Sequence, residues 1–170
     1  AISYGFVDRI PQKIALLQEI IQQFPNSNLL DDCQFELALA HTKQEDTPNA
    51  IAAYVVLINQ FSDSPYRSKA MLNKGLILYN NESPQAANAV LKRLVETYPN
   101  ETLAQQALQT VKEIAVEENT VDDFSAWLNG IDVATIPDLE LEKAAFDAIE
   151  RLLNDGKKKP LKRALQSYLE

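Results

Sequence analysis

The sequence predicts an all-α solenoid, in which antiparallel helix pairs stack on one another. An aromatic residue followed by small polar residues recurs every 37 residues, at Phe24, Phe61 and Tyr98. The same spacing relates several further positions of matching size: Ala1, Ala38 and Gly75; Ala50 and Ala87; Leu17, Tyr54 and Leu91. Prolines lie at the ends of the apolar-periodic runs, where they are compatible with helices. A fixed period of this length is typical of repeat arrays, whose units bury their apolar faces only against neighbouring units.

Each period contains two runs with helical apolar spacing, which we call helix A and helix B. Ala1 to Val7 are the predicted last turns of a first helix A, and its helix B follows over 11–24. Two clear pairs follow at 29–42 with 48–61 and at 65–79 with 84–98. A weaker pair covers 102–116 and 120–128. The expected N-terminal caps are hydroxyl side chains that precede the helices, at Thr47, Ser64, Ser83 and Thr120.

Residues 1–129 are therefore predicted to form the array, 130–137 a linker, and 138–170 a further helical hairpin that is truncated at its end. Phe124 occupies the position of Ala50 and Ala87, so we expect the last helix pair to be pushed apart or to cross differently. Because the pattern begins and ends within a helix, we expect the chain to be a fragment of a longer array.

Composition excludes several classes of function. The net charge of −8 combines −12 over residues 1–156 with +4 over 157–170, and an acidic body repels nucleic acid and anionic lipid. A single cysteine and a single histidine, Cys33 and His41, leave no disulfide, metal or cofactor site to expect. The longest uncharged apolar run, 51–58, is too short to span a membrane.

Gly75, Ala87, Leu91 and Pro99 have the small-small-large-Pro spacing of tetratricopeptide repeats, and Ala38, Ala50 and Tyr54 repeat most of it. Small residues allow helices A and B to cross closely, and the large residue fills the groove beside them. The chain thus resembles the tetratricopeptide repeat family, which implies a right-handed superhelix that binds proteins and has no catalytic residues. The period and the aromatic-Pro ending of helix B are similar to the long-repeat bacterial branch, which includes the periplasmic partner of the Tol-Pal system and the lipoprotein of the outer-membrane barrel assembly machinery.

The resemblance implies that the A helices line a groove that binds an extended peptide or a partner helix. By register the groove residues are Asp32, Phe35, Glu36, Leu39, Lys69, Asn73, Leu76, Tyr79, Asn80, Gln106, Gln109, Thr110 and Glu113. Alternatively, Phe35 and Leu76 pack between repeats and the polar residues are only solvated. Lys69 and Asn73 match one unit of the clamp by which some family members hold a terminal carboxylate, but the other units lack it, so such capture is not expected.

The remaining signals are interpreted structurally. His41 is expected to pack, and Phe124 with Trp127 to form a buried cluster instead of a ligand platform. The basic cluster Lys157, Lys158, Lys159, Lys162 and Arg163 is expected to be solvated, although it leaves open an acidic partner, lipid headgroups or nucleic acid.

The sequence thus predicts a non-enzymatic scaffold without a cofactor, in a bacterial periplasm or envelope, with the cytoplasm as the alternative compartment. The alternative function is an accessory region of an enzyme whose catalytic domain lies elsewhere. Neither the partner nor the oligomeric state follows from the residues.

Overall fold

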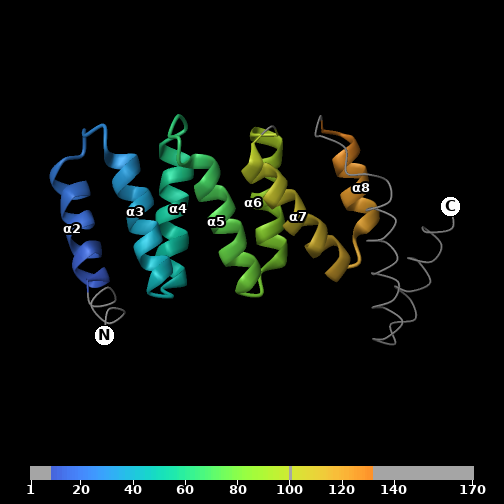
Figure 1. The fold of residues 1–170 in the computed structure, drawn as a ribbon, viewed down its shortest axis with the longest axis horizontal. Coiled ribbons are helices and arrows are strands. Elements are labelled where there is room, and N and C mark those ends of the chain that lie inside the picture. Colours follow the sequence, from blue (N-terminus) through green and yellow to red (C-terminus); the bar gives the residue numbers. More distant parts are fainter. Residues whose placement is uncertain (1–8, 100, 132–170) are drawn as a thin grey trace. The chain divides into compact units, whose positions relative to one another are not determined.

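The computed structural model describes residues 9–99 and 101–131, which form seven α-helices and no strand (Figure 1). The chain divides into two compact units, 1–83 and 84–170. The first contains α2 (Ile10–Gln23), α3 (Leu30–Lys43), α4 (Thr47–Gln60) and α5 (Arg67–Asn80). The second contains α6 (Pro84–Thr97), α7 (Thr102–Glu117) and α8 (Val121–Asn129). The predicted all-α class is confirmed for this part of the chain.

The helices recur with the predicted period of 37 residues. α4 begins and ends 37 residues after α2, and α5 does the same relative to α3. α6 repeats the bounds of α4 at the same distance. Each predicted helix end lies within two residues of the observed end. Ala1 to Val7, most of the predicted linker, the hairpin 138–170 and its basic cluster lie outside the described residues.

Within each unit, helices that are consecutive in the sequence pack side by side and run antiparallel (Figure 1). In the first unit α3 lies against α2 and α4, and α4 also packs on α5. In the second unit α7 lies against α6 and α8. This is the neighbour-on-neighbour packing of a solenoid. The handedness of the array stays a prediction.

The columns that keep the 37-residue spacing form the core of the units. Ala38, Ala50, Tyr54, Ala87 and Leu91 are all 0% exposed. Small residues at the helix crossings and large ones beside them are what close helix packing requires.

Replacing Ala50 by leucine is therefore expected to lower the free energy of unfolding by about 1–3 kcal/mol, because the fully buried methyl group leaves no room for a larger side chain. Ala52→Leu is the matched control, since Ala52 is exposed on the same helix. Urea unfolding followed by circular dichroism measures both. Equal effects of the two substitutions would contradict the predicted close crossing at Ala50.

The turn from helix A to helix B has one conformation in all three described pairs. Glu45, Glu82 and Asn119, 37 residues apart, have left-handed backbones with φ of 58°, 55° and 56°. The amide of the next residue donates to a carbonyl five residues back, as in Asp46 N to His41 O at 3.0 Å. This pattern is a Schellman motif, in which the left-handed position favours glycine.

Glu45→Gly and Glu82→Gly are expected to stabilise the protein by up to about 1 kcal/mol each. Glycine removes the strain of a side chain at positive φ, and we expect this gain to exceed the cost of the greater freedom of glycine in the unfolded chain. Ala52→Gly, in the exposed interior of α4, is the control and is expected to destabilise by about 1 kcal/mol. Thermal unfolding compares the three variants. Destabilisation by both glutamate substitutions would show that the backbone is not strained there.

The predicted caps require correction. Thr47 is the first residue of α4, and its cap is Asp46, whose carboxylate accepts a hydrogen bond from the Asn49 amide. Ser64 does not cap α5, which begins at Arg67; its Oγ instead accepts from the backbone N–H of Tyr66 at 3.2 Å. Thr120 does occupy the cap position of α8, but its side chain makes no cap hydrogen bond. Asp46 thus has two roles: its amide closes the Schellman motif after α3, and its carboxylate caps α4.

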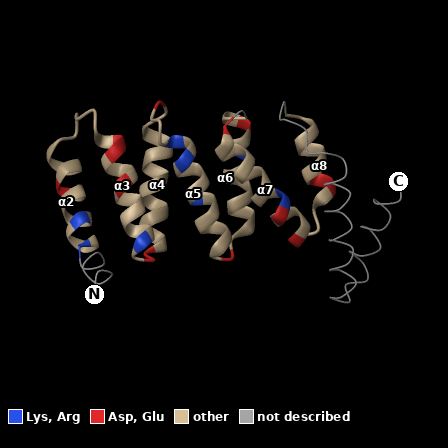
Figure 2. Cartoon of the chain, viewed as in Figure 1, with Lys and Arg blue, Asp and Glu red and all other residues tan. Residues whose placement is uncertain are grey.

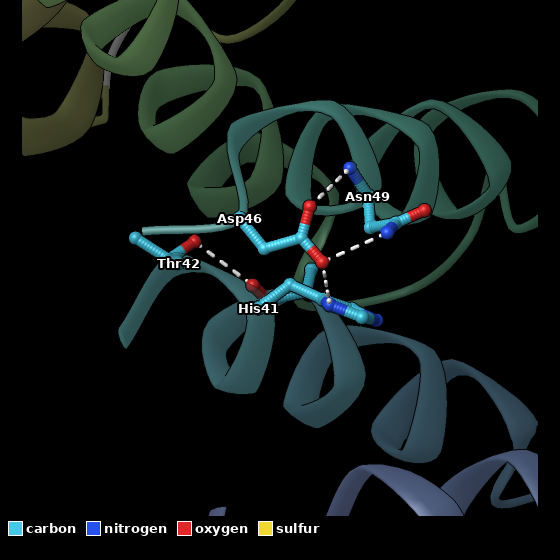
Figure 3. A network of polar contacts seen from close by, with 5 residues as sticks. His41, Thr42, Asp46 and Asn49 are labelled. Atoms are coloured by element: carbon cyan, nitrogen blue, oxygen red, sulfur yellow. Dashed lines mark hydrogen bonds and ion pairs between the residues drawn. The ribbon is translucent and has the colours of Figure 1, made fainter. Parts of the chain in front are cut away.

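Asp46 links this turn to the buried His41, which is 6% exposed, as expected of a packed residue (Figure 3). His41 Nδ1 lies 3.1 Å from Oδ2 of Asp46, and Nδ2 of Asn49 donates to the same oxygen at 2.8 Å. The hydrogen bond from the Asn49 side chain, with smaller contributions from its backbone N–H and from His41, lowers the pKa of Asp46 below its ordinary value of 3.8. The ionised carboxylate is therefore the form that the turn stabilises.

Because folding depresses the pKa of Asp46, its contribution to stability is present above pH 3.8 and is lost as the pH falls through the folded-state value. Asp46→Asn keeps a capping oxygen but loses the charge. We expect the variant to unfold at a lower urea concentration than the parent chain at pH 7, and this gap to shrink as the pH is lowered from 7 to below 3.8. A gap that stays constant over that range would contradict a stabilising role for the ionised carboxylate.

Candidate partner-binding face

The thirteen predicted groove residues are divided between the two units. Nine lie on α3 and α5 in the first unit, and four lie on α7 in the second. Five of the nine are brought together with one residue that the sequence did not indicate. We call this cluster the α3–α5 face: Asp32, Phe35, Glu36, Tyr66, Lys69 and Asn73.

Two aromatic members of the α3–α5 face stack on each other. The rings of Phe35 and Tyr66 are nearly parallel, at 13°, with centroids 4.8 Å apart. The ring of Tyr54, on α4, is tilted by 60° to that of Phe35, with the centroids 6.3 Å apart. Such ring pairs stabilise by about 0.5–1.5 kcal/mol beyond the burial of their area. Phe35 is only 4% exposed, so its ring is the buried part of the face and packs between helices.

Hydrogen bonds fix the polar side chains around this stack. The Tyr66 hydroxyl donates to Oδ1 of Asp32 at 2.6 Å, joining the start of α5 to the start of α3. Asn73 Nδ2 donates to the hydroxyl of the fully buried Tyr54 at 3.1 Å. Lys13 of α2 forms an ion pair with Glu36. Asp32, Glu36, Tyr66 and Asn73 therefore each have a hydrogen-bond or ion-pair partner within the first unit.

The start of α3 is acidic and the start of α5 is basic (Figure 2). The hydrogen bond to Asp32, together with the charge of Asp32 and the nearby Asp31 and Glu36, raises the pKa of Tyr66 above 10.0. Burial, together with the charges of Asp32 and Asp31, raises the pKa of the Cys33 thiol above 9.0. The neutral Tyr66 hydroxyl thus remains a hydrogen-bond donor at neutral pH, and Cys33 is a poor nucleophile.

Lys69 is the most accessible charged group of the face. Its side chain is exposed, and Nζ lies 5.6 Å from the centroid of the Phe35 ring, within range of a cation–π interaction. In the described part of the chain its ammonium lies within 4.0 Å of no carboxylate oxygen. The ammonium therefore keeps donors that a partner could use.

The other predicted residues of the first unit lie further along the helices. Leu39, Leu76 and Tyr79 are half-buried, and Asn80 is exposed at the end of α5. Whether these four contact a partner stays a prediction.

On α7, Gln106, Gln109 and Glu113 are exposed, and Gln109 Nε2 donates to Oε1 of Glu113 at 3.3 Å. Thr110 is 7% exposed, and its hydroxyl donates to the carbonyl of Gln106 at 3.4 Å. Its polar atom is thus satisfied within the helix, so only three of the four side chains are presented to solvent.

A second aromatic cluster joins α8 to α6. Phe124 is 2% exposed, and its ring lies 5.9 Å from that of the half-buried Trp127. Trp127 Nε1 donates to Oε1 of Glu96 at 2.7 Å, and Nζ of Lys92 lies 4.6 Å from the Trp127 ring. Because the polar edge and one face of the indole are occupied by the chain itself, the cluster fits a packing role better than a ligand platform.

Two further features are absent from residues 9–99 and 101–131. No three His, Cys, Asp or Glu side chains there are grouped closely enough to hold a metal ion. None of the helices in that part of the chain combines the length and the apolar character needed to cross a membrane.

Comparison with known families matches two stretches of the chain, 32–64 and 69–101, to the tetratricopeptide repeat. The matches begin 37 residues apart, and the α3–α5 face takes its residues from both stretches and from Tyr66 between them. No curated protein matches the chain. These two stretches are similar to tetratricopeptide repeats, which generally mediate protein–protein interactions.

Proposed function

We propose that this chain is a non-enzymatic scaffold that binds an extended peptide or a partner helix on the α3–α5 face. The observation that carries the proposal is the preorganised cluster on the A helices of two matched repeats. Preorganised side chains lose little conformational entropy when a partner binds, so more of the interaction energy appears as affinity.

The chemistry of the face favours a mixed polar and apolar ligand. Tyr66 is half-buried and offers part of an aromatic ring, while Lys69 and Asn73 offer donors within one helical turn of each other. Asp32 has a second carboxylate oxygen beyond the one that Tyr66 occupies. A peptide that alternates apolar and polar side chains would match both kinds of group.

We place the protein in a bacterial cell envelope, as part of a longer array of repeats. The support is the 37-residue period and the aromatic-Pro ending of helix B, which resemble those of long-repeat envelope proteins. Fractionation of the native host tests the compartment: release of the protein with the periplasmic or outer-membrane fraction is expected, and recovery with a cytoplasmic marker would contradict it.

A selection from a random 16-residue peptide library displayed on phage tests the binding face. The selected peptide is then titrated calorimetrically into the chain and into Lys69→Glu. The ammonium of Lys69 is exposed and has no carboxylate partner on the face, and the substitution reverses its charge. We therefore expect the dissociation constant to rise at least tenfold, which corresponds to about 1.4 kcal/mol.

Lys43→Glu is the matched control, since Lys43 is an exposed lysine at the far end of α3. It is expected to leave the affinity unchanged within twofold, and circular dichroism checks that both variants fold. Equal losses in both variants would indicate a general charge effect. Selected peptides that bind Lys69→Glu as tightly as the parent chain would place the site elsewhere.

A further inference from the structure

The two helices of the α3–α5 face carry charges of opposite sign (Figure 2). Every charged side chain in the first two turns of α3 is acidic: Asp31, Asp32 and Glu36. Every charged side chain of α5 is basic: Arg67, Lys69 and Lys74. A segment that crosses the face from α3 to α5 therefore meets carboxylates on one helix and cations on the other.

One pair of aromatic rings adjoins a charge of each sign. The Tyr66 hydroxyl donates to Oδ1 of Asp32 at 2.6 Å, and the Tyr66 ring stacks on Phe35 with the centroids 4.8 Å apart. Nζ of Lys69 lies 5.6 Å from the centroid of the Phe35 ring. The acidic group thus lies at one member of the ring pair and the basic group at the other.

Asp32 and Lys69 do not neutralise each other. In the first unit, no oxygen of Asp32 lies within 4.0 Å of Nζ of Lys69. Glu36 forms an ion pair with Lys13, whereas Asp32 accepts its hydrogen bond from the uncharged hydroxyl of Tyr66. Because Lys69 is exposed and Asp32 is half-buried, both can receive a counter-charge from outside the chain.

The negative potential of the acidic helix extends to Tyr66. The pKa of Tyr66 is raised above 10.0, first by the hydrogen bond to Asp32 and next by the charge of Asp32. Burial and the charges of Asp31 and Glu36 add smaller shifts in the same direction. A partner's carboxylate would be repelled on this side and a partner's cation attracted, and such charge complementarity fixes the orientation of a bound partner.

We infer that the segment bound on the α3–α5 face is dipolar: it places a basic side chain at Asp32 and an acidic side chain at Lys69. An apolar side chain of the same segment lies on the exposed part of Tyr66. Because the two charges are on different helices, the segment binds in one direction. This inference rests on the proposed function, since it names the class of ligand that the same face takes.

An exchange of charges within the ligand tests the inference. The probes are peptides from the phage selection that lose affinity for Lys69→Glu, and we expect each to contain an acidic and a basic side chain. The acidic and the basic residue whose replacement by glutamine weakens binding most are then exchanged in position. The exchanged peptide keeps its composition and net charge, and we expect it to bind the parent chain about tenfold more weakly.

Two variants assign each charge of the peptide to its partner. Lys69→Gln removes the cation, and Asp32→Asn removes the anion but keeps an oxygen that can accept from Tyr66. Replacing the acidic residue of the peptide by glutamine is expected to weaken binding about threefold to the parent chain and to Asp32→Asn, but not to Lys69→Gln. Replacing the basic residue is expected to give the opposite pattern. Circular dichroism checks that both variants fold.

The possible failures are distinguishable. Peptides that depend on Lys69 but lose no affinity on exchange, or that lack charges of both signs, overturn the dipolar ligand and leave the binding face in place. Equal effects of the peptide substitutions on both variants also overturn it. Selected peptides that bind Lys69→Glu as tightly as the parent chain reject the face itself, and the dipolar ligand with it.

Discussion

Replacing Phe35 by alanine is expected to lower the free energy of unfolding by about 3–5 kcal/mol, because the ring is 4% exposed and the cavity left behind cannot collapse fully. Its loss removes the contacts with both Tyr66 and Tyr54 and the surface beneath Lys69. Urea unfolding followed by circular dichroism at 222 nm measures the change.

Phe35→Leu is the control, since it keeps most of the buried volume, and we expect it to cost less than half as much. A loss below about 1 kcal/mol for Phe35→Ala would show that the ring is not part of the core. It would also restore Phe35 as a free groove residue. A loss of about 3–5 kcal/mol would instead support the alternative that Phe35 packs between repeats.

Phe124→Ala is expected to destabilise the second unit by a similar amount, about 3–5 kcal/mol, because Phe124 is 2% exposed and α8 has only nine residues to hold it in place. Trp127 is the reporter: its ring lies 5.9 Å from Phe124, so its fluorescence should report the unfolding of α8 directly.

Ala126→Ser, on the exposed side of α8, is the matched control and is expected to change stability by less than about 0.5 kcal/mol. An unchanged Trp127 transition in Phe124→Ala would mean that the phenylalanine at the position of Ala50 and Ala87 contributes nothing to docking of α8. That it alters the helix crossing stays a prediction.

The periodic positions of the chain made the helices predictable from the sequence. Leu17, Tyr54 and Leu91 share a spacing of 37 residues, and the observed helices follow the same spacing closely. The caps were less predictable. Thr47 precedes a proline and therefore resembles a cap residue followed by proline at the first helical position. Proline is also tolerated at the second helical position, and in α4 the helix begins at Thr47, so Asp46 is the cap. The left-handed Glu45 and Glu82 carry no glycine signal, so the turn motif was not visible either.

The residues of the α3–α5 face were predictable in part, but that this face binds a partner stays a prediction. The register places Asp32, Lys69 and Asn73 on the A helices, and the structure has them on α3 and α5. The register could not show that Phe35 is buried, because repeat spacing indicates which side of a helix a residue lies on but not what covers that side. Tyr66 lies inside the predicted helix 65–79 but was not among the predicted groove residues, and in the structure it precedes α5, which begins at Arg67.

Site-specific photocrosslinking in the native host tests the central claim, that the α3–α5 face binds a protein partner. The photoreactive residue p-benzoylphenylalanine is placed at Lys69 on the face, or at Asn59, which is exposed on α4. We expect a discrete crosslinked protein from position 69 and none from position 59. A crosslink to the same protein from position 59 but not from position 69 would contradict the account.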